Sequence, residues 1–217
     1  MGPASKRLRV IVTRPREQAE PLASRLEVLG LKVVRCPLLE LEPVGPDTVN
    51  VDGYDWVVVT SPRGALELAR RLRGEPANVA AIGPGTAAAL REHGLEPDLV
   101  PQVSTQEGLV AELPRPPGRV LFAGAEDARP YLAEALGAET VVLYRTRPLC
   151  PVEPPSGDLV LLASPSAARA FAELGLDIPA VSIGPETTRE ARSRGIDVIA
   201  EAETHDVDGL VAAVTRI

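Results

Sequence analysis

The chain reads Val57-Val58-Val59-Thr60-Ser61-Pro62-Arg63-Gly64-Ala65, an apolar run that leads directly into a Ser-Pro pair. A similar stretch, Leu159-Val160-Leu161-Leu162-Ala163-Ser164-Pro165-Ser166-Ala167, follows later in the sequence. A short apolar run is typical of a buried strand, and Ser followed by Pro is typical of the first residues of a helix. The chain therefore contains the same strand-to-helix turn twice, and this repeat predicts two similar lobes.

The repeat continues beyond these turns and gives the order of the elements. The first copy contains Ala81-Ile82-Gly83-Pro84-Gly85-Thr86, and the second copy contains the similar stretch Ser182-Ile183-Gly184-Pro185-Glu186-Thr187. Strands and helices alternate, which predicts parallel sheets with right-handed crossovers. We expect strands at 9–13, 32–36, 56–59, 79–82, 99–100, 119–123 and 140–144, and helices at 16–29, 63–72, 86–92, 107–113 and 129–136, with 159–214 repeating the order of the first long unit.

We therefore predict an α/β fold with two flavodoxin-like or Rossmann-like lobes that contain parallel sheets. Two stretches rich in Pro, 37–46 and 145–155, interrupt the alternation and are expected to be extended, because Pro disfavours helix. We interpret them as a two-stranded extended linker between the lobes. Sequence symmetry alone leaves open whether each lobe is one half of the chain or whether the chain crosses to the second lobe and returns.

Composition narrows the range of functions. With 3% aromatic residues no base-stacking surface is visible, and a net charge of −7 is not typical of a protein that follows phosphates, although net charge leaves a local basic patch open; we expect no nucleic-acid partner. Cys36 and Cys150 are far apart in sequence, which indicates neither a zinc site nor a disulfide framework and suits a reduced cytosol. All but two of the 23 basic residues are Arg, which is consistent with a thermophilic source or with GC-rich coding.

No apolar stretch is long enough to cross a membrane, and no signal peptide is evident. We therefore expect no membrane partner and a cytoplasmic location. No long exposed apolar helix or strand is evident either, which favours a monomer.

Familiar catalytic and cofactor motifs are missing or incomplete. Gly83-Pro84-Gly85-Thr86-Ala87-Ala88 resembles a dinucleotide fingerprint, but Pro occupies a variable position and Glu186 replaces the second glycine in the other copy. We interpret His93 as a helix-end residue and His205 as a solvated residue of an acidic loop. We expect no cofactor, no metal site and no Ser-His-Asp triad.

The Pro-started turns are the best candidates for a binding site. A helix N-terminus offers free N–H groups and the positive end of the helix dipole, so several of them suit a ligand with many anionic groups, although simple capping explains any one turn alone. Hydroxyl, Arg and Gly residues gather at these turns and strand ends. The candidate binding residues are Thr13, Arg14, Thr60, Ser61, Arg63, Gly85, Thr86, Ser164, Ser166 and Thr187.

Tyr144 is a further candidate, because it ends the strand Val141-Val142-Leu143 where the chain enters the connector. Its alternative is a tyrosine that packs at a strand end with its hydroxyl satisfied by the backbone.

The chain resembles the uroporphyrinogen III synthase family from Arg9 to Val214, through the order and spacing of short motifs. These motifs are Thr13-Arg14-Pro15, Thr60-Ser61-Pro62-Arg63, Ile82-Gly83-Pro84-Gly85-Thr86, the strand closed by Tyr144, Ser164-Pro165-Ser166 and Ile183-Gly184-Pro185-Glu186-Thr187-Thr188. The resemblance implies the crossover topology. It places lobe one at 1–36 plus 149–217, lobe two at 43–143, the paired linker strands at 37–42 and 144–148, and the active site in the interlobe cleft.

The implied reaction is that of a cofactor-free lyase. It closes hydroxymethylbilane with loss of water and inversion of ring D to give uroporphyrinogen III, in tetrapyrrole and haem biosynthesis, with transient hand-over from hydroxymethylbilane synthase. The implied route ionises the terminal hydroxyl to an azafulvene, forms a spiro intermediate at ring D, then fragments and recloses. Because the free substrate cyclises readily to the uninverted isomer, the main task is positioning.

The resemblance also implies roles for particular residues. Tyr144 matches a tyrosine thought to assist departure of the hydroxyl, and Thr86 and Thr187 match hydroxyls around the substrate. Glu186 stands where the family motif has a threonine, so that hydroxyl is missing here. The substrate carries eight carboxylates, for which the expected donors are the backbone N–H groups of Ser61, Gly85, Ser166 and Thr187 and the side chains of Arg14 and Arg63.

Two other interpretations stay open on the residues alone. One is a non-catalytic bilobal binding protein for a small polyanionic ligand, because fold does not fix activity. The other is a nucleotide-dependent enzyme of flavodoxin-like architecture, although the missing phosphate loops count against it.

Overall fold

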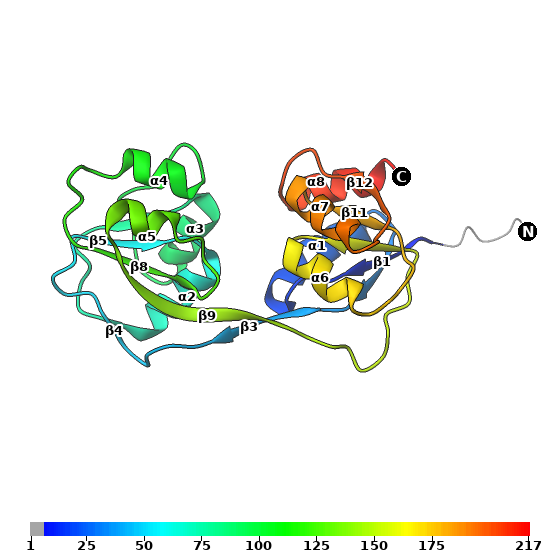
Figure 1. Ribbon diagram of the computed structural model, residues 1–217, viewed down its shortest axis with the longest axis horizontal. Coiled ribbons are helices and arrows are strands. Elements are labelled where there is room, and N and C mark those ends of the chain that lie inside the picture. Colours follow the sequence, from blue (N-terminus) through cyan, green and yellow to red (C-terminus); the bar gives the residue numbers. More distant parts are fainter. Residues whose placement is uncertain (1–6) are drawn as a thin grey trace, which may run out of the picture. The chain divides into compact units, whose positions relative to one another are not determined.

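The computed structural model describes residues 7–217, in which strands and helices alternate along the chain (Figure 1). The strands are β1 (Arg9–Val12), β2 (Lys32–Arg35), β3 (Leu39–Pro43), β4 (Val49–Asn50), β5 (Trp56–Val59), β6 (Leu72–Arg73), β7 (Val79–Ala81), β8 (Val120–Ala125), β9 (Glu139–Pro148), β10 (Leu159–Leu162), β11 (Ala180–Ser182) and β12 (Val198–Glu201). The helices are α1 (Arg16–Val28), α2 (Pro62–Arg71), α3 (Pro84–Glu92), α4 (Gln106–Glu112), α5 (Tyr131–Leu136), α6 (Pro165–Ala172), α7 (Pro185–Ser193) and α8 (Val207–Thr215).

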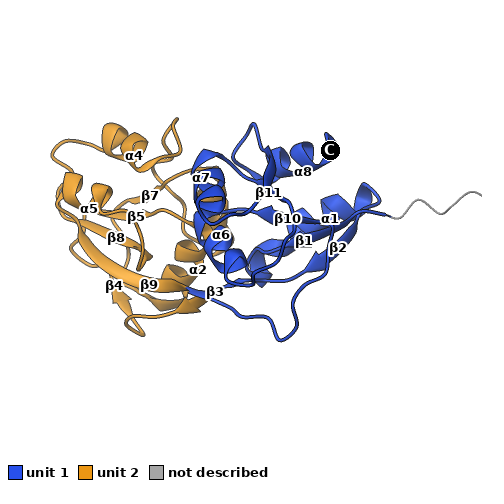
Figure 2. Ribbon diagram, turned by 45° about the vertical axis from the view of Figure 1, so that its right-hand side comes forward, with its two compact units in different colours: residues 1–40, 147–217 blue, residues 41–146 orange. Residues whose placement is uncertain are grey.

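The chain forms two compact units (Figure 2). Unit 1 consists of Met1–Glu40 and Arg147–Ile217, and unit 2 of Leu41–Thr146. Unit 1 is therefore discontinuous in sequence, with unit 2 inserted between its two parts.

Unit 1 is a three-layer α/β unit with a parallel sheet in the order β12-β11-β10-β1-β2. Numbered by their order within the unit, the strands run 5-4-3-1-2, which is the flavodoxin-like order. Successive residues point to opposite faces: Ile11 packs with α6 and α7, whereas Val10 and Val12 pack with α1 and α8. The predicted fold class is confirmed for this unit.

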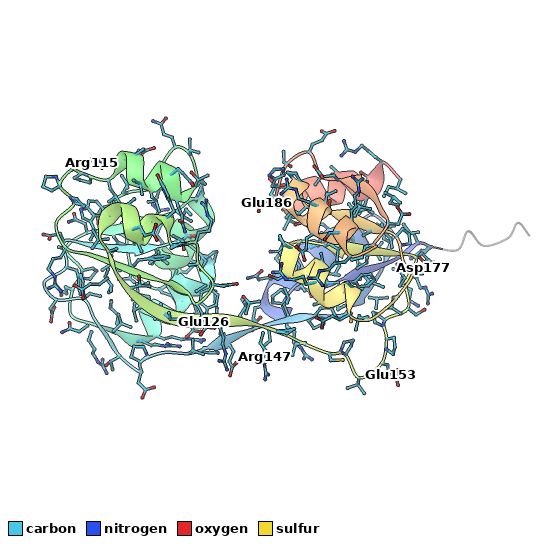
Figure 3. The ribbon with its side chains drawn as sticks, viewed as in Figure 1. Arg115, Glu126, Arg147, Glu153, Asp177 and Glu186 are labelled. Atoms are coloured by element: carbon cyan, nitrogen blue, oxygen red, sulfur yellow. The ribbon has the colours of Figure 1, made fainter. Side chains whose placement is uncertain are left out.

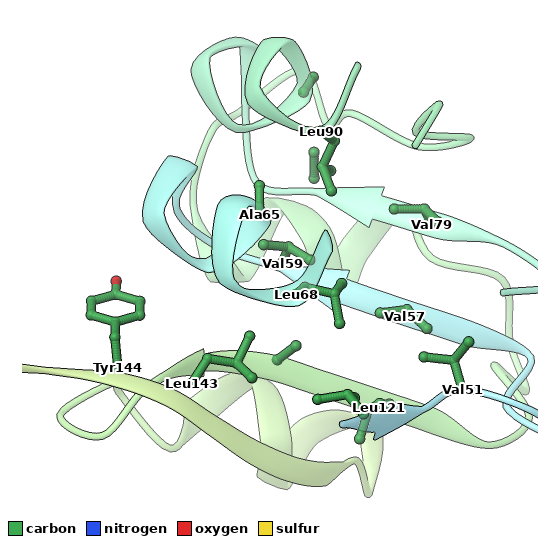
Figure 4. Close-up of a cluster of buried hydrophobic side chains, with 14 of the residues drawn as sticks. Val51, Val57, Val59, Ala65, Leu68, Val79, Leu90, Leu121, Leu143 and Tyr144 are labelled. Carbon is green, nitrogen blue, oxygen red and sulfur yellow. The ribbon is translucent and has the colours of Figure 1, made fainter. Parts of the chain in front are cut away.

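Unit 2 has the same layers, with strand order β3-β9-β8-β5-β7. Val57 and Val59 pack with α2 and α3 on one face of the sheet, and Val58 packs with α4 and α5 on the other. Figure 4 shows the first of these clusters, which is built from aliphatic side chains, with Tyr144 at one end. The strands are parallel except at β3, so each unit can bury a two-sided core as an α/β sheet requires.

The strand that ends at Tyr144 is longer than the sequence indicates. We expected it at 140–144 with a connector from Arg145 onwards, but β9 continues to Pro148. The reason is its partner β3: Val44 N–H donates to Leu143 O (2.9 Å) and Leu149 N–H to Leu38 O (2.8 Å), which is an antiparallel pairing. Ion pairs Arg145–Glu42 (2.9 Å) and Arg147–Glu40 (2.8 Å) follow the same register.

Two other local expectations need correction. The strand expected at 99–100 is only an isolated bridge between Leu99 and Ala80, because Pro97 and Pro101 on either side lack the N–H that a ladder needs. The small parallel pair β4–β6, which joins Val49–Asn50 to Leu72–Arg73, was not expected, since each strand is too short to show a pattern.

All four Pro-started helices are present where the repeat places them. Pro62, Pro84, Pro165 and Pro185 each occupy the first turn of a helix. Ser61 and Ser164 cap α2 and α6 by accepting from Gly64 N–H (2.9 Å) and Ala167 N–H (3.1 Å). Capping is therefore part of the role of both serines.

Candidate functional site

The carboxyl edge of the unit 1 sheet is where a ligand site is expected. After β1 the chain goes to β2 on one side, and β10 lies on the other side of β1, so this is the point where the strand order reverses. Thr13 and Arg14 follow β1, and Ser164 follows β10. The sequence prediction that these residues share one sheet edge is consistent with the paired register of β1 and β10.

A cavity of about 380 Å³ opens at this edge between the starts of α6 and α7. The lining includes Ser164, Pro165, Gly184, Glu186, Thr187 and His205. Both helices begin here, so free backbone N–H groups and the positive ends of two helix dipoles lie at the cavity. Figure 3 shows Glu186 projecting from unit 1 at the start of α7.

Thr187 and Thr86 are buried threonines at equivalent places in the two units. Thr187 is 2% exposed and Thr86 is 3% exposed, in the first turns of α7 and α3. Within residues 7–217 neither hydroxyl has a hydrogen-bond partner, whereas the neighbouring Thr188 bonds Ser182 Oγ (2.5 Å) and Gly184 O (3.2 Å). Neither oxygen is one of the fully buried side-chain atoms that lack a partner, so both hydroxyls retain some access and are available for a ligand.

Thr13 is not accessible. It is fully buried, and its hydroxyl donates to Leu161 O at 2.8 Å, which fastens the end of β1 to β10. The hydroxyl of Thr13 therefore already has a partner inside the sheet, which counts against the prediction that it binds a ligand.

Arg14, the next residue, is half-buried, and its Nη2 donates to Gln18 Oε1 at 3.3 Å. Burial lowers the pKa of its guanidinium from the ordinary value. In the described part of the chain no carboxylate pairs with Arg14, so its positive charge is available at this edge.

In unit 2 the sequence candidates Tyr144 and Ser61 come together. Tyr144 Oη lies 2.9 Å from Ser61 Oγ, and either oxygen can be the donor. Because Ser61 Oγ also accepts from Gly64 N–H, the pair is held by the start of α2. The tyrosine hydroxyl thus bonds a side chain, and not the backbone as the alternative interpretation supposed.

Tyr144 is 8% exposed, and burial raises the pKa of its phenol above the ordinary value. The hydrogen bond to Ser61 and the charge of Arg63 lower this pKa, and Asp127 raises it, but burial is the largest cause. Tyr144 therefore stays protonated at neutral pH and can act only as a proton donor there.

The guanidinium of Arg63 has its partners within unit 2. Its guanidinium pairs with the carboxylate of Glu67 (2.9 Å) and donates to Leu41 O (3.2 Å). Glu67 is 2% exposed and also pairs with Arg71 at 2.7 Å. An internal carboxylate already pairs with Arg63, which counts against the prediction that it binds a ligand carboxylate.

The remaining candidates lie at the edges where the sequence places them. Thr60 and Ser61 are half-buried at the end of β5, and Gly85 is exposed at the start of α3. Ser166 is half-buried at the start of α6, and its hydroxyl accepts from Arg169 Nη2 at 3.0 Å. The backbone N–H groups of these helix starts remain the donors that these positions can offer.

His205 and Ser104 are the residues that sequence reasoning missed. A Cβ on Gly184 would lie 2.8 Å from His205 Cδ2, and a Cβ on Gly83 would lie 2.6 Å from Ser104 Oγ. Each side chain therefore rests on the bare backbone of a helix start, just before the N-cap residues of α8 and α4. A comparison of the two copies of the repeat could have identified both residues, since His205 and Ser104 hold the same place in the two copies.

Two further properties concern metal binding and membrane-spanning helices. Across residues 7–217, no group of three or more His, Cys, Asp or Glu side chains converges in a way that can hold a metal ion. Within the same range no helix is both long enough and apolar enough to pass through a bilayer.

Comparisons with known proteins agree with the resemblance of the motifs. The family model described as uroporphyrinogen-III synthase HemD matches residues 20–212. A uroporphyrinogen-III synthase of Synechococcus elongatus is 25% identical over 250 aligned positions, which cover 95% of this chain and 94% of the relative. A protein described as a putative uroporphyrinogen-III synthase, from Methanocaldococcus jannaschii, is 32% identical over 149 positions, 64% of this chain and 62% of that relative.

A solved structure has the same fold. The crystal structure of a mutant uroporphyrinogen III synthase from the extremely thermophilic bacterium Thermus thermophilus superposes with a TM-score of 0.62, covering 96% of this chain and 98% of that one. The identity is 21%, so this likeness bears on the architecture alone.

Proposed function

Since the chain belongs to the uroporphyrinogen-III synthase family of tetrapyrrole biosynthesis, we propose that it closes hydroxymethylbilane to uroporphyrinogen III with loss of water and inversion of ring D. The observation that carries the proposal is the family match over residues 20–212. That match disfavours both a non-catalytic binding protein and a nucleotide-dependent enzyme. The reaction class is that of a lyase.

Substrate carboxylates and pyrrole N–H groups need partners that the two sheet edges supply. In unit 1 the proposed donors are Arg14, the N–H groups at the starts of α6 and α7, and the hydroxyl of Thr187. In unit 2 the corresponding groups are the N–H of Gly85 and the hydroxyl of Thr86. The absence of a hydrogen-bond partner for either threonine hydroxyl within residues 7–217 supports this assignment, because each can then bond a substrate group.

Departure of the terminal hydroxyl is the step that needs acid help. We assign the proton to the Tyr144–Ser61 pair, which lies 2.9 Å apart. The leaving hydroxyl takes this proton and departs as water while the pyrrole nitrogen supplies the electron pair, which yields the azafulvene in its N-protonated, cationic form. If Tyr144 donates to Ser61, then Ser61 passes its own proton on; in the reverse orientation Tyr144 donates directly.

The acid supplies a modest part of the rate, and positioning supplies the selectivity. The linear substrate closes unaided to the uninverted isomer, so the protein has to hold ring D where attack at its substituted carbon is favoured. The backbone N–H groups, the hydroxyls and Arg14 suit this task, since they hold carboxylates without transferring protons to them.

The test is a product analysis. Hydroxymethylbilane is added to the protein, the products are oxidised to porphyrins, and the type I and type III isomers are resolved by chromatography. We expect the type III isomer to dominate, whereas a protein-free control gives type I. Type I alone in the presence of the protein would overturn the proposal.

We also propose that the chain works as a monomer in the cytoplasm and receives its substrate by transient contact with hydroxymethylbilane synthase. Free thiols at Cys36 and Cys150 are compatible with a reducing compartment. Sedimentation of the purified chain tests the oligomeric state. Turnover in a coupled assay, with an added trap for free hydroxymethylbilane, tests the hand-over.

A further inference from the structure

His205 shares the unit 1 cavity with Thr187, and no step described so far uses it. Its imidazole lies on the backbone of Gly184, where a Cβ would be 2.8 Å from Cδ2 and 3.0 Å from Nε2. The side chain is exposed, so it reaches both the cavity and solvent. Gly184 thus leaves the space that allows the ring to lie against the start of α7.

The cavity already contains one anionic group. Glu186 lines it from the first turn of α7, in a position where it repels an incoming carboxylate. Of the described residues that line this cavity, only His205 can become positively charged. The hydroxyl of Thr187 lies in the same lining without a hydrogen-bond partner among the described residues and without being fully buried, so it can bond a polar ligand there.

We propose that His205 binds a carboxylate of the substrate as an imidazolium and offsets Glu186, so that binding at unit 1 is coupled to uptake of one proton. This inference rests on the proposed function. A carboxylate that binds against an imidazole favours the protonated ring, so binding at this place draws a proton onto His205. Ser104, the counterpart in unit 2, cannot carry a charge.

The other charged groups around His205 are compatible with this role. From the start of α8 the neighbouring charged residue is Asp206, which accepts from Gly209 N–H (2.7 Å) and from Thr204 Oγ1 (3.0 Å). Those hydrogen bonds chiefly lower the pKa of Asp206, with smaller contributions from the charges of Arg25 and His205. From α7 the charged group is Glu186, and from the β10–α6 turn the cavity receives only the uncharged Ser164.

An NMR titration tests the proton coupling directly, because the chain has 2 histidines. The Cε1–H signals of His93 and His205 are followed against pH with and without uroporphyrin III as the octacarboxylate probe, and a His93→Gln variant assigns them. We expect the probe to raise the pKa of His205 by about 0.5 to 1 pH unit and to leave His93 unchanged, since opposite charge favours the imidazolium. Equal shifts, or none, would overturn the inference.

Kinetics of the variant His205→Ser, which copies the unit 2 residue, give an independent readout. We expect KM at pH 6 to rise about three- to fivefold, the worth of an exposed ion pair, while kcat stays the same and the pH dependence of KM between 6 and 8 is lost. His93→Gln is the matched control and keeps the wild-type profile. If His205→Ser keeps the wild-type KM profile and still forms the type III isomer, this inference alone is refuted. If the wild-type protein does not form the type III isomer, the proposed function is refuted and this inference with it.

Discussion

The two units share one framework and differ in their charged groups. Both have a Ser-Pro helix start, a second Pro-started helix, and a buried threonine in its first turn. Unit 2 adds the phenol of Tyr144 at its serine, whereas unit 1 adds His205 and Glu186 at its cavity. On our proposals, the repeated part supplies neutral donors and each copy carries one further group of its own: the acid in unit 2 and a charge-binding histidine in unit 1.

The interiors differ as well. In α2 of unit 2 the buried carboxylate of Glu67 pairs with Arg63 and Arg71, and the repeat places Ala170 of α6 at the same point in unit 1. Arg63 likewise corresponds to Ser166. Unit 2 therefore depends on an internal ion network that unit 1 does without.

The largest expected effect comes from removing that network. Glu67→Ala, which copies unit 1, leaves the partly buried charges of Arg63 and Arg71 without their carboxylate and should lower the free energy of unfolding by about 3–5 kcal/mol. Urea unfolding measures this loss. Glu190→Ala, at an exposed ion pair with Arg194 in unit 1, is the control and should change stability little. Equal midpoints for the two variants would refute the stated dependence of unit 2 on its ion network.

The next effect concerns the acid that only unit 2 carries. Tyr144→Phe should lower kcat about ten- to a hundredfold and leave KM nearly unchanged, because a positioned acid contributes to the transition state alone. Ser61→Ala combined with Tyr144→Phe should be no worse than the more damaging single change if the two hydroxyls act as one relay. Fully additive losses in kcat would separate Ser61 from the proton path.

Tyr144 also determines how we expect kcat and folding stability to depend on pH. Because burial raises the pKa of Tyr144, the acid form persists beyond the ordinary value of about 10, so kcat should show no loss from this group below that pH. The same shift means that folding stability associated with Tyr144 is present below about pH 10 and is lost as the pH rises through the folded-state pKa. A kcat profile that falls near pH 8 in the wild type, but not in Tyr144→Phe, would contradict this.

A smaller effect distinguishes the two adjacent threonines of α7. Thr187→Val should leave the thermal midpoint unchanged or slightly higher, since its hydroxyl is unpaired, and should raise KM about tenfold if that hydroxyl binds a charged substrate group. Thr188→Val is the opposite case: it removes hydrogen bonds to Ser182 and Gly184 and should cost about 1–3 kcal/mol. Calorimetry and steady-state kinetics on both variants check the contrast, which would be lost if both were destabilised alike.

The smallest effect is expected at Gly85, the unit 2 counterpart of Glu186. A Cβ at Gly85 meets no atom within 4 Å, so Gly85→Ala should stabilise α3 by about 0.5 kcal/mol at most. Its backbone N–H is retained, so KM should stay at the wild-type value. A large rise in KM would mean that the substrate approaches the Cα itself, and that a bare backbone matters more here than the amide.

The sequence was sufficient for the fold class because the pattern is local. Apolar runs, Pro at four helix starts and the repeat define the strands, the helices and their carboxyl edges without knowledge of packing. Thr86 and Thr187 could be selected for the same reason: each lies three residues after a repeated glycine. The length of β9 could not be seen, because it depends on pairing with β3, which is distant in sequence.

Contacts within the site could be predicted from the sequence to different degrees. The hydrogen bond of the Thr13 hydroxyl could not, because its acceptor, Leu161 O, is a partner that only the sheet provides. The ion pairs of Arg63 could, since Arg63, Glu67 and Arg71 recur every fourth residue and such spacing favours ion pairs along a helix. His205 was set aside as an isolated histidine, although comparison of the two repeats would have paired it with Ser104 and brought it to a helix start.

The insertion of one unit within the other also orders events during synthesis. Leu41–Thr146 is contiguous, so unit 2 can close its core as soon as it leaves the ribosome. β1 cannot complete its pairing at this stage. Its neighbour β10 is translated only after the whole of unit 2, and until then one edge of the apolar strand β1 has no hydrogen-bonding partner. Pulse-labelled nascent chains should therefore yield a protease-resistant core from the middle of the polypeptide before its beginning becomes protected.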